Sequence, residues 1–243
     1  MKKIKITSMN LQCWVGTISW YWEYVHFWKY VFSLSTFHLE KSVNFLSQQS
    51  IDIAFCNEIS DKHRGKAFLS QLDYLQVASW IKNSAFFVTH LIGKKSKEGN
   101  AFLSQFPIIK NVSHPLKSSK IKRILGESIV DIEGRRVHLF VVHLSLGVQI
   151  RNEQIQEIIQ TISATKDPVI LWGDFNTHVL HEIAQHTRLR SCWNFNTFPS
   201  WNPKKCLDHI FVSEEFTVHE ACTYNELLFS DHLPLVAVVS LPD

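Results

Sequence analysis

Cysteine is scarce and scattered in this chain of 243 residues, which has five cysteines and no CxxC pair. An odd number of isolated cysteines argues against a disulfide framework and favours a reducing compartment, so we expect a cytoplasmic protein. Cys206 and His209 have the spacing of two zinc ligands, but no second pair accompanies them. Because a structural zinc site needs further ligands, we expect none here.

Long apolar runs are also missing. The aromatic-rich segment from Trp14 to Phe37 is interrupted by charged residues and histidines, so no run approaches the roughly 18 apolar residues that a membrane-spanning helix needs. The opening residues contain lysines but no apolar stretch of the length of a signal peptide. Low-complexity tracts, internal repeats and long linkers are absent too, which predicts a single domain over residues 1–243 and, we expect, a monomer.

What the chain does have is ample material for a hydrophobic core and a mild excess of positive charge. Hydrophobic residues make up 45% and charged residues 19% of the sequence, which is typical of a folded globular domain rather than a disordered chain. The formal net charge of +3 is compatible with an anionic substrate, but it is far below that of a protein that coats nucleic acid.

Hydrophobic periodicity divides the chain into strands and helices. Apolar residues recurring on one face predict helices at residues 35–49, 62–72, 151–165 and 177–186. Apolar runs bounded by glycines and turns predict strands at residues 1–11, 51–59, 74–80, 84–93, 100–109, 126–132, 135–144, 168–174, 206–213, 216–224 and 233–241. Hairpins combined with intervening helices predict an α/β or α+β sandwich in which helices cover stacked sheets.

The stretch PVILWGDFNTH, residues 168–178, ends a buried strand on an acid and an amide. Nothing in Val169–Trp172 alternates with polar residues, which indicates burial on both faces, and Gly173 allows a turn or a close backbone approach. If the chain stays extended beyond this glycine, Asp174 and Asn176 point to the same side. The alternative is a turn that merely closes the strand, and these residues alone favour neither reading.

Other apolar runs also end on polar side chains. The residues at these ends carry carboxylates, amides and imidazoles, and they are Asn10, Glu58 and His143. Near the carboxyl end of the chain, Asp208 and the pair Asp231-His232 bring acids next to histidines. The chain has no candidate for a nucleophilic serine on a strained turn. The repeated pattern therefore predicts one shared pocket that carries acidic groups and imidazoles.

With these residues in place, the chain resembles the endonuclease/exonuclease/phosphatase superfamily of metal-dependent phosphoesterases, also called DNase-I-like. The resemblance spans nearly the whole chain, and its blocks follow in the expected order: MN, NEI, GNAFLSQFPI, HLSLGVQIRNEQ, GDFN, TFPSWNPKKCLDHIFVS and SDHLPL. GDFN alone would be weak, but in order with LDHIFVS and SDHLPL it is specific. The resemblance implies a four-layer αββα sandwich, with two mixed, mostly antiparallel sheets packed face to face and helices outside.

The resemblance also implies a site for Mg²⁺ or Mn²⁺, hard cations that prefer oxygen ligands. In this expectation Glu58 holds the metal with help from Asn10, and Asp231 serves the metal or its water shell. The family usually has glutamine before the metal-binding glutamate, whereas this chain has Asn57. The shorter amide affects the geometry around the ligand rather than the ligand itself.

The implied catalytic residues each have a chemical role. His232 is the general base or an electrostatic partner, and Asp208 orients it. Asp174 activates or aligns the attacking water, and which of Asp174 and His232 takes the proton stays open. Asn176 fixes the position of Asp174 and binds phosphate, and His143 donates a hydrogen bond to the phosphate.

Substrate contacts follow less directly. The matched blocks imply substrate-binding roles for Asn100, Arg151 and Trp201. Lysines gather at residues 93–97 and 117–123, where they form either solvated loops or a positive rim that attracts phosphate groups. The aromatic segment 14–37 could pack on the sandwich, contact a membrane interface or stack on unpaired bases.

A fold of this kind gives phosphoester hydrolysis but not the substrate. The leading hypothesis is a phosphodiesterase that acts on nucleic acid, which the mild basicity of the chain and its scattered cysteines favour. The alternative enzyme is a phospholipid-headgroup hydrolase, similar to a sphingomyelinase or a phosphoinositide phosphatase, which would use segment 14–37 at a membrane. A hypothesis of another class is an inactive binding or scaffold protein on the same fold. Every matched catalytic position carries a competent residue, which argues against the last.

Overall fold

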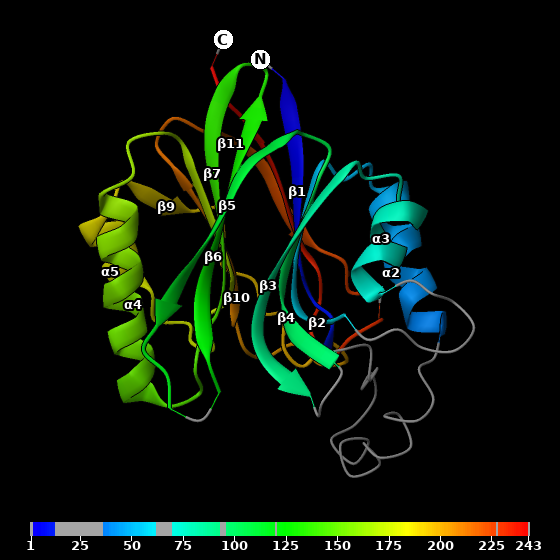
Figure 1. Cartoon of the computed structure of the whole chain (residues 1–243), viewed down its shortest axis with the longest axis horizontal. Helices are drawn as coiled ribbons and strands as arrows, with labels where there is room; N and C mark the ends of the chain where they lie inside the picture. Colours follow the sequence, from blue (N-terminus) through cyan, green and yellow to red (C-terminus); the bar gives the residue numbers. More distant parts are fainter. Residues whose placement is uncertain are drawn as a thin grey trace.

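Two six-stranded sheets packed face to face form the centre of the molecule, and helices lie on the outer face of each (Figure 1). A computed structural model describes residues 2–12, 36–61, 70–92, 96–119, 121–226 and 228–242. The first sheet has the strand order β11 (Thr217–Thr223), β12 (Leu235–Ser240), β1 (Lys3–Asn10), β2 (Ile53–Ser60), β4 (Ser96–Ser104) and β3 (Asn83–Ile92). The second has the order β5 (Ile108–Leu116), β6 (Arg123–Ile132), β7 (Arg135–His143), β8 (Val169–Asp174), β10 (Asp208–Ser213) and β9 (Leu189–Ser191).

Each sheet contains one parallel pair among antiparallel neighbours. The pair is β1 and β2 in the first sheet and β7 and β8 in the second. A parallel pair needs a crossover connection, and here the crossovers contain α2 (Thr36–Gln48) and α4 (Val148–Ser163). The smaller helices α3 (Gln71–Ala78) and α5 (His181–His186) lie beside them (Figure 1). The predicted four-layer αββα sandwich is confirmed.

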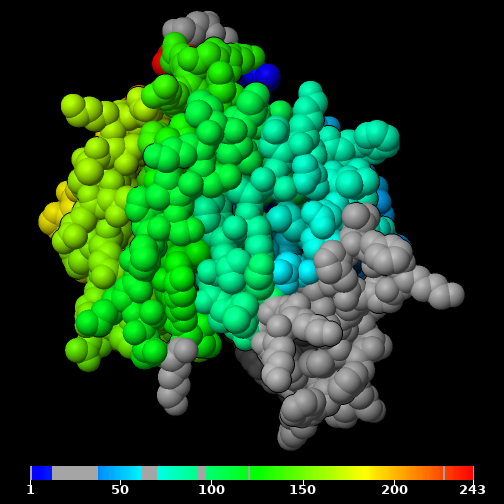
Figure 2. Space-filling view, in the orientation of Figure 1, coloured from blue at the N-terminus to red at the C-terminus, as the bar shows by residue number. Residues whose placement is uncertain are grey.

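Three apolar clusters hold these layers together. The largest lies between the two sheets, where the fully buried Trp172 of β8 packs on Phe55 of β2 with ring centroids 3.7 Å apart. The second lies under α2 and α3, and the third under α4 and α5. In the space-filling view, green strands from the middle of the chain cover the centre of one face between the outer layers (Figure 2). Successive residues of a strand point to opposite faces of its sheet. Apolar residues along each sheet therefore contribute both to the cluster between the sheets and to the cluster under the helices.

The close packing of β8 against β7 requires a glycine at residue 173. Its φ is +147°, and a Cβ placed there would lie 1.9 Å from the carbonyl oxygen of Val142 on β7. The parallel strands β7 and β8 thus approach each other too closely at this point for any other residue.

The region around α3 differs from the sequence-based prediction. Residues 74–80 were predicted as a strand and residues 62–72 as a helix, but the helix begins at Gln71 and includes most of the predicted strand. Ser70 caps it, because its hydroxyl accepts from the backbone N–H of Asp73 while the Asp73 carboxylate accepts from the backbone N–H of Ser70. This capping box fixes the helix start, and it outweighs the strand-like composition of residues 74–80.

Residues 62–69 lie outside the described residues, as do residues 14–35 of the aromatic segment 14–37 and residues 93–95 of the first lysine cluster. Within the described ranges, no helix combines the length and apolar character needed to cross a membrane.

Candidate active site

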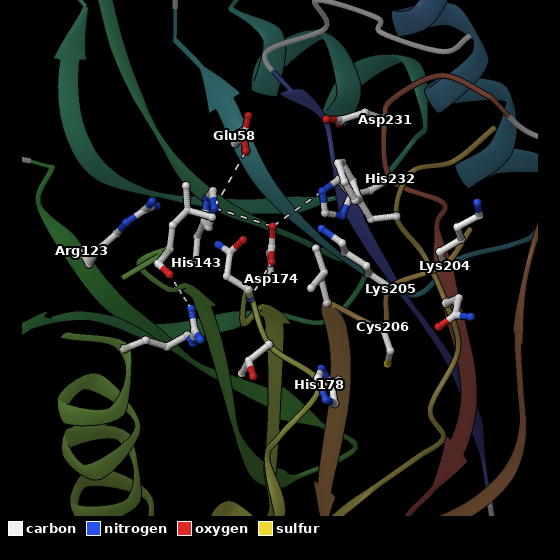
Figure 3. A pocket seen from close by; sticks show the side chains of 17 residues that line it. Glu58, Arg123, His143, Asp174, His178, Lys204, Lys205, Cys206, Asp231 and His232 are labelled. Carbon is white, nitrogen blue, oxygen red and sulfur yellow. Dashed lines mark hydrogen bonds and ion pairs between the residues drawn. The ribbon is translucent and has the colours of Figure 1, made fainter. Parts of the chain in front are cut away.

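One edge of the sandwich collects the polar strand ends. The parallel strands β1, β2, β7 and β8 all reach this edge with their carboxyl ends, and the antiparallel strand β10 begins there. The register places Asp174 beside His143 on one side and beside Asp208 on the other. Side chains that are far apart in sequence therefore face one cavity of about 970 Å³ (Figure 3).

Glu58 reaches this cavity from an irregular part of β2. The pairing of β2 with β4 shifts between Cys56 and Ile59, and Glu58 has a φ of +53°. A bulge of this kind re-aims a side chain at the edge of a sheet. The amide nitrogen of Asn10 donates to Glu58 Oε1 at 3.1 Å and to Asp174 Oδ2 at 3.3 Å, while its oxygen accepts from the backbone of Gln12. Asn10 thus holds the two carboxylates near each other.

His232 and Asp208 form a buried imidazole–carboxylate pair. His232 Nδ1 lies 2.7 Å from Asp208 Oδ2, which also accepts from the Thr197 hydroxyl at 2.5 Å. His232 Nε2 then faces the cavity, 3.8 Å from Asp174 Oδ2. Burial alone would lower the pKa of His232, but the charge and hydrogen bond of Asp208, with further charge from Asp174, hold the pKa well above its usual value. Asp208 therefore orients the ring and favours its cationic form.

His143 is the opposite case. Burial, together with the positive charges of Arg123 and His232, holds the pKa of His143 well below its usual value, so this ring is neutral. Its Nε2 lies 3.7 Å from Asp174 Oδ2 and 3.9 Å from Glu58 Oε1. Figure 3 shows these three side chains facing one another. A neutral imidazole can donate one hydrogen bond from this position.

Asp174 and Asn176 lie together because the chain turns, not because it stays extended. Strand β8 ends at Asp174, and Asn176 has a φ of +54°. The backbone N–H of Asn176 donates to Asp174 Oδ1 at 2.9 Å, and its side-chain nitrogen donates to the Leu144 carbonyl at 2.9 Å. Both readings of PVILWGDFNTH were therefore partly correct, since an aspartate-capped turn closes the strand and its two polar residues both line the cavity.

The oxygen donors of this site fit a divalent cation. Burial and the neighbouring Asp231 raise the pKa of Glu58 to about 8, and burial raises that of Asp174 to about 6. Carboxylates crowded in this way are stabilised by a cation, and Mg²⁺ and Mn²⁺ prefer oxygen ligands. Donor atoms of Asp174, Asp208 and His232 also lie within 4.8 Å of one another. Asp208 Oδ2 is bonded to His232 and Thr197, while its buried Oδ1 has no hydrogen-bond partner within the described residues. The carboxylates that line the cavity, and so can face a cation there, are those of Glu58, Asp174 and Asp231.

Positive side chains lie on opposite sides of the carboxylates. Arg123, at the start of β6, and the pair Lys204 and Lys205 flank Asp174 in Figure 3. The Lys205 ammonium lies 5.8 Å from the centre of the Phe198 ring. Burial lowers the pKa of Arg123, whose Nε is buried and has no hydrogen-bond partner within the described residues.

The predicted site residues divide into three groups. Those lining the cavity are Glu58, His143, Arg151, Asp174, Asn176, Asp231 and His232, while Asn10 and Asp208 contact members of this group. Two predicted substrate contacts are not part of the cavity wall: Asn100 is buried beneath the site, where it bonds to Asn57, and Trp201 lies on the turn after Phe198.

Sequence reasoning missed the roles of several cavity residues. Arg123 ends the lysine-rich cluster 117–123 that was predicted as a positive rim, so a signal for it existed. Phe198, Lys204 and Lys205 stand in the matched block before Asp208, but their residue types alone did not separate them from an ordinary loop.

Comparisons with known proteins support the fold described above. The profile of the Endonuclease/Exonuclease/phosphatase family matches residues 37–232. The structure is similar to that of an endonuclease/exonuclease/phosphatase from Beutenbergia cavernae, with a TM-score of 0.80 and 19% identity over 99% of this chain and 72% of that one. No curated protein is similar enough in sequence to match the chain.

Two further structures share the fold. One is D. rerio TDP2 complexed with a single-strand DNA product, with a TM-score of 0.70 and 18% identity over 99% of this chain and 100% of that one. The other is a mannosyl-6-phosphatase from Bacteroides thetaiotaomicron, with a TM-score of 0.71 and 17% identity over 98% of this chain and 100% of that one. At these identities the likeness establishes the architecture alone.

Proposed function

The chain belongs to the endonuclease/exonuclease/phosphatase family, and on this premise we propose that it is a divalent-metal-dependent phosphodiesterase that cleaves nucleic acid. The observation that carries this proposal is the meeting of the Asp208–His232 pair with the Glu58 and Asp174 carboxylates at the edge of one cavity. These groups supply the parts that hydrolysis of a phosphoester needs: a proton acceptor, a hydrogen-bond donor and a cation site.

The proposed reaction is attack of water on phosphorus. Asp174 Oδ2 and His232 Nε2, 3.8 Å apart, flank the position of the water. One water proton passes to Asp174 as the new P–O bond forms, because a cationic His232 has no free nitrogen lone pair. The bond to the leaving oxygen breaks, and that oxygen keeps the electron pair. The neutral His143 donates to a non-bridging phosphate oxygen, and Asn176 fixes Asp174 through its backbone N–H. Mg²⁺ or Mn²⁺ held by Glu58, Asp231 and Asp174, near Asn10, would neutralise charge on the phosphate.

A nucleic-acid strand is the substrate that best explains the positive side chains. A single phosphate needs cations on one side, whereas a strand carries phosphates on both sides of the bond that is cleaved. Arg123 lies on one side of Asp174 and Lys204 and Lys205 lie on the other (Figure 3). Among the described residues, no carboxylate lies within 4.0 Å of the nitrogens of these side chains. D. rerio TDP2, bound to a single-strand DNA product on the same fold, supports this choice.

A substrate panel tests the proposal. Single-stranded DNA, nicked DNA, abasic DNA, RNA, sphingomyelin, phosphoinositides and small phosphodiesters are each incubated with Mg²⁺ or Mn²⁺. We expect cleavage of a nucleic acid that requires the metal and is abolished by Asp174→Asn. The exposed Glu214 makes no hydrogen bond or ion pair within the described residues, so Glu214→Gln serves as the control. Metal-dependent cleavage of lipids alone would contradict the proposal and support the headgroup hydrolase.

Salt dependence tests the role of the lysines separately. The double change Lys204→Ala and Lys205→Ala should raise KM and leave kcat nearly unchanged. It should also reduce the slope of log KM against log salt by about 1 for each phosphate group that the variant no longer neutralises. The control is Lys110→Ala, because Lys110 is exposed on β5 and does not line the cavity. An unchanged slope would show that the two lysines do not contact the phosphates of the substrate.

The other hypotheses have less support. The membrane hypothesis depends on segment 14–37, of which residues 14–35 lie outside the described residues. The scaffold hypothesis would predict a broken site, but the matched catalytic residues meet around one cavity. We propose in addition that the enzyme is monomeric. We further propose that it is cytoplasmic, since the described cysteines Cys56, Cys192, Cys206 and Cys222 are all free thiols. Light scattering of the purified protein checks the first of these two statements.

A further inference from the structure

Asn57 connects the two sheets directly beneath the active site. It stands on β2, is 1% exposed and does not line the cavity. Its side-chain nitrogen donates to Asn100 Oδ1 on β4 at 2.9 Å and to the Val142 carbonyl on β7 at 3.0 Å. Its side-chain oxygen accepts from the backbone N–H of Asp174 on β8 at 3.1 Å. One amide therefore joins its own sheet to both parallel strands of the facing sheet.

The bulge in β2 lets two consecutive side chains reach the facing sheet, since Asn57 contacts Val142 and Asp174 while Glu58 Oε1 lies 3.9 Å from His143 Nε2. Cys56 pairs with Ala101 and Ile59 pairs with Gly99, so Asn57 and Glu58 together stand opposite the single residue Asn100. Glu58 has a φ of +53°, a backbone conformation that a non-glycine residue adopts only where its surroundings enforce it. Side-chain hydrogen bonds hold both bulge residues, those of Asn57 to Asn100, Val142 and Asp174 and the one from Asn10 to Glu58.

Gly173 supports the same arrangement from the other sheet. The Val142 carbonyl that accepts from Asn57 is the group that a Cβ at residue 173 would meet at 1.9 Å. The absence of a side chain on Gly173 therefore keeps this carbonyl accessible to the amide. Residue 174, whose N–H binds the same amide, follows directly. Asn57, in the space that Gly173 leaves beside Val142, thus connects the strand that carries Glu58 to the strand that carries Asp174.

We propose that Asn57 is a positioning residue that sets the separation of the Glu58 and Asp174 carboxylates, and through it the affinity of the site for a divalent cation. This inference rests on the proposed function, because it assumes that these carboxylates hold the metal. Only an amide meets the requirement, since two carbonyl oxygens must receive a donor and one N–H must find an acceptor. A carboxylate in its place would face the oxygens of Val142 and Asn100 with no proton to donate.

The test compares two variants of Asn57 by a readout that does not depend on catalysis. Mn²⁺ affinity is measured from the electron paramagnetic resonance signal of the free ion, on samples whose circular dichroism shows that they are folded. We expect Asn57→Asp to weaken Mn²⁺ binding about 10-fold or more, the usual effect of losing a residue that orients a metal ligand. Asn57→Gln keeps the donor and the acceptor, so it should retain most of the affinity. The loss of Mn²⁺ affinity should therefore be larger in Asn57→Asp than in Asn57→Gln.

The control is Asn83→Asp on β3. The Asn83 side-chain nitrogen also donates to two carbonyls, those of Ser104 and Phe106, but it lies away from the cavity. This variant should lower the urea midpoint without changing the Mn²⁺ affinity of the folded protein. If Asn57→Asp also binds Mn²⁺ within twofold of the unchanged chain, the positioning role is wrong.

A metal-free measurement keeps the inference distinguishable from the proposed function. The Asp174 amide should exchange its hydrogen slowly in the unchanged chain and at least 10-fold faster in folded Asn57→Leu, because its acceptor is lost, whereas Asn57→Gln keeps an acceptor and should exchange slowly. Equal exchange rates would overturn the inference even if the enzyme cleaves nucleic acid. A chain that cleaves no phosphodiester but shows both effects would overturn the proposed function and leave the position of Asn57 intact.

Discussion

Single residues at the catalytic edge determine both the stability of the fold and the chemistry of the site, and Gly173 is an example of an effect on stability. Replacement by alanine places a Cβ 1.9 Å from the Val142 carbonyl oxygen at a φ of +147°. We expect Gly173→Ala to destabilise the fold by on the order of 3 kcal/mol, because the parallel strands must separate. Urea unfolding followed by circular dichroism measures the change. Gly134→Ala is the control, since Gly134 also has a positive φ but a Cβ there meets nothing within 4 Å, and it should cost about 1 kcal/mol.

Asp208 shows the chemistry of a single buried charge. It is 1% exposed and accepts from both His232 and Thr197, so it fixes the orientation of the ring that faces Asp174. We expect Asp208→Asn to lower kcat by about 10²-fold or more while the protein stays folded, because the ring loses its charged partner. Thr197→Val removes only the hydroxyl that supports Asp208 and should have a much smaller effect. Equal losses in the two variants would mean that packing, rather than charge, accounts for the result.

At the scale of elements, a chain of charged groups ties β5, β6 and β7 together. Glu127 on β6 lies 2.5 Å from His138 on β7 and 2.6 Å from His114 on β5, and His138 also faces Asp167 at 3.4 Å. Burial would raise the pKa of Glu127, but hydrogen bonds from the two histidines hold it below its usual value. The hydrogen bond to Glu127 outweighs burial and raises the pKa of His138. This cluster should make the stability of the fold depend on pH.

The direction of the pH dependence follows from these two shifts. A carboxylate whose pKa is lowered by folding stabilises the fold at pH values above its pKa in the unfolded chain, which is about 4.3. This stabilisation is lost as the pH falls through the pKa of the folded state. A histidine whose pKa is raised by folding stabilises the fold at pH values below its pKa in the unfolded chain, which is about 6.5. This stabilisation is lost as the pH rises through the pKa of the folded state. We expect Glu127→Gln to lower the urea midpoint most between about pH 5 and 6.5 and less on either side. The exposed Glu133→Gln should change it little at any pH.

Elements were predictable where local signals agreed with the tertiary structure. The run Val169–Trp172 is buried on both faces because β8 lies in the centre of its sheet, so its uniform apolar character identified it correctly. Residues 74–80 misled the prediction because they are rich in aromatic and β-branched residues, while the signal that fixed the helix was the cap at Ser70. Composition within a short window does not contain that cap, and it lies just before the window begins.

The site was predictable in kind but not in arrangement. Polar residues that end apolar runs had to meet, because parallel strands end at the same edge of a sheet, and the structure brings them to one cavity. The burial of Asn100 was not predictable, since it depends on the bulge that sets both Asn57 and Glu58 opposite it. Arg123 was visible only as the end of a lysine-rich cluster, because its place in the cavity follows from the packing of one sheet on the other.

At the scale of the whole molecule, a bound cation should stabilise the entire sandwich. Glu58 comes from the first sheet and Asp174 from the second, so a cation held between them resists separation of the sheets. At about 100 times its dissociation constant, Mn²⁺ should add about 2.7 kcal/mol and raise Tm by roughly 5–10 °C, and a chelator should reverse this. Calorimetry with and without Mn²⁺ measures the shift. Glu58→Gln should remove most of it and Glu214→Gln should keep it, whereas an equal shift in both variants would place the cation elsewhere.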